Sequence, residues 1–150
     1  MMDYEVCLRL KDLGMKLEDV DDIPKYDVDA YDVDIKQCDF VVDFLRKKDL
    51  SEKEICNLLK ENPYMISVEK GRCLVIDDIL NGLGFLKKDK KILINSNNYI
   101  YTASPTEMDS IIKYMKSIGY NKEEIRNKFL DDTDLITDTL EDAKIKILRK

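Results

Sequence analysis

Histidine and tryptophan are absent from this 150-residue chain, and the absence of histidine removes several classes of function. Without histidine the chain can form neither a Ser-His-Asp triad nor a Cys-His pair. Histidine-containing zinc sites and haem sites with a histidine axial ligand are excluded as well. A phosphate-binding loop is also missing, because Gly82-Leu83-Gly84 lacks the third glycine and the preceding strand of a dinucleotide-binding turn. We therefore expect a protein that is not an enzyme, has no evident small-molecule substrate and uses no cofactor or metal.

Cysteines and long apolar runs are also scarce. The four cysteines, at positions 7, 38, 56 and 73, form no CxxC motif, and we expect them to be reduced and mostly buried. No segment approaches the ~18 apolar residues of a membrane span, and the acidic N-terminus does not resemble a secretory signal. These features favour a cytoplasmic protein without a membrane partner.

Charge is plentiful but unevenly distributed. Charged residues make up 37% of the chain, and the formal net charge is -6. Residues 1–44 contain 5 basic and 13 acidic residues, whereas residues 45–150 contain 20 and 18. The acidity is therefore an N-terminal property, and the remainder of the chain is nearly balanced.

An internal period of 35 residues is the strongest pattern. Gly14, Gly84 and Gly119 are 70 and 35 residues apart, and Asp49 stands at the position that completes the series. At this offset most columns are apolar in at least three copies. The position four residues before the glycine holds Leu10, Leu45, Leu80 and Met115, and the position six residues after it holds Val20, Ile55, Lys90 and Ile125.

Each copy predicts a capped helix, a short turn or 3₁₀ segment, and a second helix that ends at the glycine. Ser51 and Asn121 each precede a glutamate by three residues, which is typical of a capping box, and Ser104-Pro105 begins a second helix. We expect an all-α fold, a helical-repeat solenoid of about four 35-residue units in a single domain over 1–150. The units are an acidic N-terminal cap repeat at about 1–44 and repeats at about 45–79, 80–114 and 115–150.

Residues 26–35 leave an alternative open, because apolar residues alternate there with aspartate at the period of a strand. Aspartate is a poor strand former, and a lone strand would have no partner. The register of the repeat instead makes this segment a turn and the start of a second helix, which is the interpretation we favour.

The clearest copy, Leu45 to Ile79, resembles the repeat of the mitochondrial transcription termination factor (mTERF) family. It contains Leu50-Ser51-Glu52-Lys53-Glu54-Ile55, Leu58-Leu59 and then Asn62-Pro63-Tyr64-Met65-Ile66, with proline fourteen residues after the glycine position. The resemblance implies a curved solenoid of helical triplets that is not an enzyme. It also implies binding of nucleic acid along a positively charged face, in the service of gene expression.

Two sets of residues are candidates for a binding surface. The first is the basic cluster Lys87, Lys88, Lys90 and Lys91 with the following Tyr99 and Tyr101, which could contact phosphates and stack on bases. The second is the acidic set Asp27, Asp29, Asp32 and Asp34, a polar cap of the solenoid or a surface for a protein partner. Nucleic acid and protein therefore both remain candidate partners. The alternative to a nucleic-acid regulator is a protein-interaction solenoid with an acidic N-terminal face.

The apolar columns also predict a core. We expect the following residues to be buried: Ile55, Leu58, Leu59, Val75, Ile79, Ile111, Ile112, Met115, Ile125 and Phe129.

Overall fold

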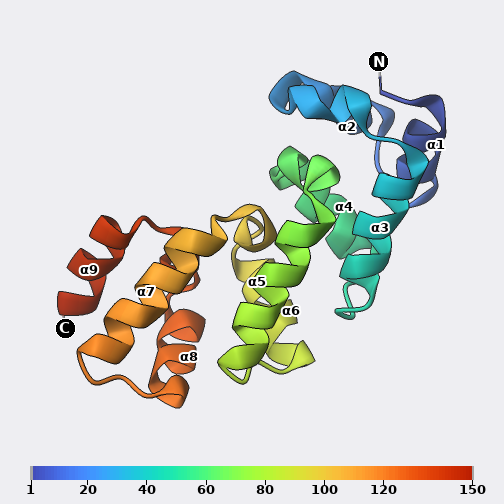
Figure 1. Ribbon diagram of the computed structural model, residues 1–150. Helices are drawn as coiled ribbons and strands as arrows, with labels where there is room; N and C mark the ends of the chain where they lie inside the picture. Colours follow the sequence, from blue (N-terminus) through green and yellow to red (C-terminus); the bar gives the residue numbers. More distant parts are fainter. Residues whose placement is uncertain (1, 150) are drawn as a thin grey trace. The chain divides into compact units, whose positions relative to one another are not determined.

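The computed structural model describes residues 2–149, which form nine α-helices and four 3₁₀ helices without a strand (Figure 1). The α-helices are α1 (Tyr4–Asp12), α2 (Leu17–Tyr26), α3 (Ile35–Arg46), α4 (Glu52–Glu61), α5 (Lys70–Gly82), α6 (Lys87–Ser96), α7 (Pro105–Ser117), α8 (Lys122–Asp131) and α9 (Leu140–Leu148). The 3₁₀ helices are η1 (Val28–Asp32), η2 (Pro63–Ser67), η3 (Ile100–Thr102) and η4 (Thr133–Thr137). The prediction of an all-α fold is confirmed.

The boundaries of the helices follow the sequence period. Helices α2, α4, α6 and α8 begin at residues 17, 52, 87 and 122, and α3, α5, α7 and α9 begin at 35, 70, 105 and 140. One 3₁₀ helix separates the two helices of each pair. Residues 26–35 hold the end of α2, η1 and the start of α3, so the helical interpretation of the alternating segment is correct. The stacking of four such units into a solenoid stays a prediction.

Side chains at the caps explain where several helices begin. Ser51 accepts a hydrogen bond from the Glu54 amide at 3.1 Å, while the Glu54 carboxylate accepts one from the Ser51 amide at 2.9 Å. Asn121 and Glu124 make the same reciprocal pair in front of α8. Each cap satisfies amides that have no partner inside the helix.

A left-handed residue follows each of the helices α1, α3, α5 and α7. Gly119 has a φ of 102° after α7, and Gly14 and Gly84 are also positive. Asp49 takes the same place after α3 with a φ of 63°, and no other described residue apart from glycine has a positive φ. The divergent position in the sequence therefore keeps the backbone conformation of the repeat.

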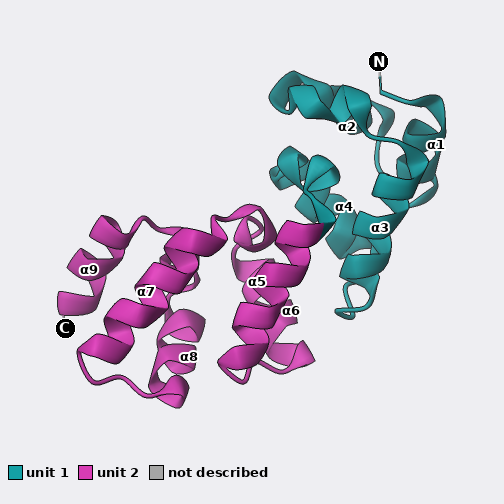
Figure 2. Ribbon diagram, viewed as in Figure 1, with its two compact units in different colours: residues 1–70 teal, residues 71–150 magenta. Residues whose placement is uncertain are grey.

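The chain divides into two compact units, residues 1–70 and 71–150, which are coloured separately in Figure 2. In unit 1, α1 packs on α2 and α3, and η2 contacts α2, α3 and α4. In unit 2, α6 packs on α8, α7 packs on α9, and η4 contacts both α7 and α8. The 3₁₀ helices thus lie between the first and second helices and join consecutive copies. A single domain over 1–150 stays a prediction.

Polar contacts at a fixed register also link consecutive copies. The Gln37 side chain, in the first turn of α3, donates to the Val68 carbonyl at 2.6 Å. Thirty-five residues later Arg72 donates to the Thr102 carbonyl at 3.2 Å, and a further 35 residues on Glu107 accepts from the Leu140 amide at 3.0 Å. The side chains differ, but each ties the start of a second helix to the following copy.

The core follows the apolar columns with two exceptions. Eight of the ten expected residues are buried, including Ile55, Ile125 and Phe129 at 0% exposure. Val75, however, is 48% exposed, and Ile79 is half-buried. Cys73, Ile76 and Leu80 are the residues of α5 that face the core, and Val75 lies two residues from Cys73, on the opposite side of a 3.6-residue helix.

Candidate nucleic-acid interface

The exposed part of the basic cluster is the first turn of α6. Lys87 and Lys88 are exposed there. Leu86 is the N-cap residue of α6, and its side chain has no oxygen that could accept a hydrogen bond from the first amides of the helix. Asn121 in front of α8 does have one. The partial positive charge of a helix N-terminus therefore adds to the two ammonium groups. Asp89, in the same turn, accepts a hydrogen bond from the Leu86 amide at 3.0 Å, so one carboxylate offsets part of this positive charge. Lys87 and Lys88 are the exposed cations of the turn, and a phosphate is an anion of matching chemistry.

Lys90 does not belong to that surface. Lys90 is 7% exposed, and its ammonium lies 3.1 Å from a carboxylate oxygen of Asp77 and 2.6 Å from the amide oxygen of Asn81. Both partners come from α5. The structure therefore gives Lys90 a role inside unit 2, where it cannot reach a nucleic acid without leaving these partners.

Lys91 is half-buried in the structure. It occupies the repeat position of Cys56 and Arg126. Cys56 donates to the Leu13 carbonyl at 3.4 Å, and Arg126 donates to the Leu83 carbonyl at 2.8 Å. This position faces the end of a second helix in both units, so Lys87 and Lys88 are the stronger candidates for phosphate contact.

The two tyrosines lie in different environments. Tyr101, in η3, is 2% exposed, and its hydroxyl donates to Asp77 at 2.6 Å. Burial and this hydrogen bond raise the pKa of Tyr101. Tyr99 is 47% exposed, but it follows the C-terminal end of α6, roughly 14 Å along the helix from Lys87. The structure therefore does not bring an exposed aromatic ring together with the exposed lysines.

One further exposed lysine occupies the same repeat position as Lys87 and is not among the predicted site residues. Lys122 begins α8, is exposed, and stands 35 residues after Lys87. Because α6 packs on α8 and both helices begin at equivalent repeat positions, we expect their first turns to lie on the same side of unit 2. The same turns also contain Asp89, Glu123 and Glu124. We call Lys87, Lys88 and Lys122 the basic edge. The repeat offset was the signal that could have found Lys122.

The acidic set is divided between structural and exposed positions. Asp27 is 4% exposed, caps η1 through the Asp29 amide and accepts a hydrogen bond from the Ser67 hydroxyl. Asp34 caps α3 by accepting from the Gln37 amide at 2.8 Å. Only Asp29 and Asp32 are exposed without a capping role of this kind.

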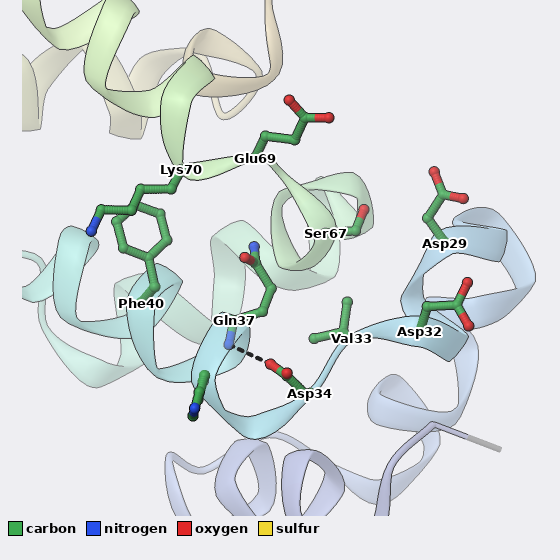
Figure 3. A pocket seen from close by; sticks show the side chains of 10 residues that line it. Asp29, Asp32, Val33, Asp34, Gln37, Phe40, Ser67, Glu69 and Lys70 are labelled. Atoms are coloured by element: carbon green, nitrogen blue, oxygen red, sulfur yellow. Dashed lines mark hydrogen bonds between the residues drawn. The ribbon is translucent and has the colours of Figure 1, made fainter.

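Asp29 and Asp32 line a groove of about 690 Å³ in unit 1. Figure 3 shows them on one side of the groove, with Phe40 and Lys70 on the other and Gln37 between the two sides. The Lys70 ammonium lies 5.7 Å from the centre of the Phe40 ring. The groove therefore has two carboxylates on one wall and an aromatic ring with a lysine on the other, where Glu69 stands beside Lys70.

The two units differ in charge. Residues 1–70 contain 11 basic and 18 acidic residues, a net charge of -7, whereas residues 71–150 contain 14 and 13, a net charge of +1. The basic edge thus lies in the unit that is not acidic overall. Residues 2–149 hold no group of acidic or cysteine side chains with the arrangement of a metal site. Among the described helices, none has the length and apolar character needed to span a bilayer.

Comparison with known proteins gives one family. The mTERF family model matches residues 9–143 of the chain. A comparison with curated proteins gives no match. The matched range covers most of both units and every candidate site residue discussed above.

Proposed function

The chain belongs to the mTERF family, and from this premise we propose that it is a non-enzymatic helical-repeat protein that binds nucleic acid and regulates gene expression. The observation that carries the proposal within this chain is the basic edge. Lys87, Lys88 and Lys122 are exposed on neighbouring helices of a unit with almost no net charge. Phosphate contacts supply most of the non-specific affinity of proteins for nucleic acids, and this edge has the chemistry to make them.

The experiment is a titration of labelled duplex DNA and single-stranded RNA by fluorescence anisotropy at several salt concentrations. The variant Lys87→Glu/Lys88→Glu should weaken binding at least tenfold and make the salt dependence shallower, by about 0.9 in the log–log slope for each duplex phosphate that the variant no longer neutralises. Lys113→Glu/Lys116→Glu is the matched control, because it changes the charge of unit 2 equally on exposed positions of α7. The control should bind within about twofold of the natural chain, apart from the general effect of charge.

Two results would count against the proposal. Absence of binding by the natural chain to either nucleic acid at about 50 mM salt would remove it. Equal weakening by both double variants would show that net charge, and not the basic edge, governs the interaction.

A second candidate function is recognition of a basic protein segment by the acidic groove of unit 1. It is favoured by the exposed carboxylates Asp29 and Asp32 and by the net charge of that unit. An arginine-rich labelled peptide is a suitable probe. Asp29→Asn/Asp32→Asn should weaken its binding more than Glu18→Gln/Asp21→Asn, which neutralises two exposed acids of α2 outside the groove. Equal effects of the two variants would contradict this candidate.

A further inference from the structure

A buried polar cluster joins three elements of unit 2. Asp77 of α5 accepts a hydrogen bond from the Tyr101 hydroxyl of η3 at 2.6 Å and lies 3.1 Å from the ammonium of Lys90 on α6. The Lys90 side chain is 9% exposed, and that of Asp77 is 20% exposed. The Lys90 ammonium also donates a hydrogen bond to the Asn81 amide oxygen at 2.6 Å. We call Asp77, Lys90 and Tyr101 the polar triplet.

The same three repeat positions are apolar in the neighbouring copies. Thirty-five residues earlier they hold Val42, Ile55 and Ile66, and thirty-five residues later they hold Ile112, Ile125 and Ile136. All six of these side chains are at most 5% exposed. The polar triplet therefore replaces three aliphatic core residues at once, and its members are complementary to one another.

Burial of an ion pair is a weak source of stability, because the cost of removing two charges from water offsets most of their attraction. Its effect on specificity is different. Packing of a helix with a buried lysine against an aliphatic surface is strongly disfavoured, because the ammonium loses its water without gaining a carboxylate partner. A buried polar residue fixes the register of coiled coils in this way.

Repeats of the same structure need such a distinction. The first helices share their apolar columns, so α6 could pack against another second helix, in the same chain or in a second copy, and bury nearly the same apolar surface. Misassembly and domain swapping are characteristic failures of repeat proteins. Lys90 and Asp77 penalise every pairing of α6 with a second helix other than α5.

We propose that the polar triplet is a register-specifying element that makes α5 the one second helix on which α6 packs. The proposal does not depend on nucleic-acid binding. It predicts that the triplet contributes uniqueness of pairing, while an aliphatic triplet at the same positions would contribute equal or greater stability.

The experiment uses the full chain with Asp77→Ile/Lys90→Ile/Tyr101→Ile, which copies the residues found at 112, 125 and 136. Its unfolding midpoint in urea should equal or exceed that of the natural chain. After refolding, however, it should show more than one set of amide signals in NMR spectra or a swapped dimer in light scattering. Lys90→Ile or Asp77→Ile alone should lower the folded-to-unfolded ratio roughly 10²- to 10³-fold, because each removes the ionic partner of the other charge. Asp77 would then keep only the Tyr101 hydroxyl, and Lys90 only the Asn81 amide oxygen.

The matched control is Ile112→Val/Ile125→Val/Ile136→Val, which alters the equivalent aliphatic triplet without changing polarity. It should keep one set of signals, and splitting in this control would overturn the proposal by showing that any loosening of the core has this effect. A single species for the isoleucine variant, at any stability, would overturn it as well. If that variant does not fold, Asp77→Asn/Lys90→Met decides: several species support the proposal, and one species refutes it.

Discussion

The role of Lys90 depends on the residues that surround it in the fold. In the sequence it lies within a run of lysines, which favours a solvated or phosphate-binding cluster. Its repeat column, with Val20, Ile55 and Ile125, indicates a core position instead. The structure agrees with the column, since Lys90 is 7% exposed and paired with Asp77. A buried cation was predictable from the column alone, but its partner was not, because Asp77 belongs to another helix.

Asp49 and Gly119 give a prediction at the same scale. Both have a positive φ, which costs a residue with a Cβ about 1 kcal/mol or more relative to glycine. Asp49→Gly should therefore leave stability unchanged or raise it by up to about 1 kcal/mol, whereas Gly119→Ala should lower it by about 1–2 kcal/mol. Urea unfolding checks both values. Gly71→Ala is the control, because Gly71 lies in α5 with ordinary backbone angles and open space around its Cα, and this variant should stabilise the helix. A decrease of stability in Asp49→Gly larger than that in Gly119→Ala would contradict the prediction.

Tyr101 predicts a decrease of stability at high pH. Burial and the hydrogen bond to Asp77 raise the pKa of Tyr101 above its ordinary value of about 10. Above pH 10 the unfolded chain therefore releases a proton that the folded chain retains, so the free energy of unfolding falls as the pH rises, by up to about 1.4 kcal/mol per pH unit for this group. The contribution is complete below pH 10.

The measurement is urea unfolding between pH 8 and about pH 11, with Tyr101→Phe as the comparison. The phenylalanine variant is less stable at neutral pH, since it lacks the hydrogen bond, but its stability should fall less steeply above pH 10. The remaining slope includes the titration of Cys38, because burial raises the pKa of its thiol to about 11. Parallel curves for the two proteins would show that Tyr101 does not titrate in this way.

At the scale of the helix, local chemistry predicts boundaries well. Ser51 and Asn121 cap α4 and α8 as their sequences indicate, and Pro105 begins α7. These signals involve residues three or four apart and do not depend on the rest of the fold. The prediction for Val75 was wrong because its column also contains Ser110, and the exposed side of α5 carries Leu74 and Val75 together. Periodicity finds a helix more reliably than it finds which of two apolar flanks is buried.

Ile125 and Val75 test this distinction directly. Ile125 lies in α8 at 0% exposure, so Ile125→Ala should destabilise the protein by about 2–5 kcal/mol, because it buries less apolar surface and leaves a cavity. Val75 is 48% exposed, and Val75→Ala should change stability by less than about 1 kcal/mol, aided by the better helix propensity of alanine. Urea unfolding of the two variants gives both values. Similar decreases would mean that Val75 is covered in solution.

For the whole molecule, the sequence period predicts the order of the helices but not the polar contacts between copies. Gln37, Arg72 and Glu107 share a repeat position and differ in charge and in whether they donate or accept, yet all three contact the following copy. Such contacts use backbone groups of the following copy, which any polar side chain of suitable length reaches. For the same reason the candidate interface differs from the one that the sequence predicts: Lys90 and Tyr101 are internal, and Lys122 joins Lys87 and Lys88.

The uneven charge of the two units leads to a final prediction. Unit 1 has a net charge of -7 and unit 2 a net charge of +1. Repulsion among like charges destabilises a compact state, and it acts over about 30 Å at 0.01 M salt but only about 8 Å at 0.15 M. Raising the salt concentration over this range should therefore slow amide hydrogen exchange in α1–α4 more than in α6–α9.

Hydrogen exchange followed by mass spectrometry resolves the two units in one sample. The control variant Asp29→Asn/Asp32→Asn reduces the charge of unit 1 to -5 by removing two exposed carboxylates that line the groove. Its salt response in α1–α4 should be smaller than that of the natural chain, while the response of α6–α9 should not change. If both units gain equal protection from exchange, salt acts on the whole chain alike. The acidity of unit 1 then does not limit the stability of that unit. If only unit 1 responds, its carboxylates are mutually repulsive in the free protein, and a basic partner on that unit would relieve the repulsion.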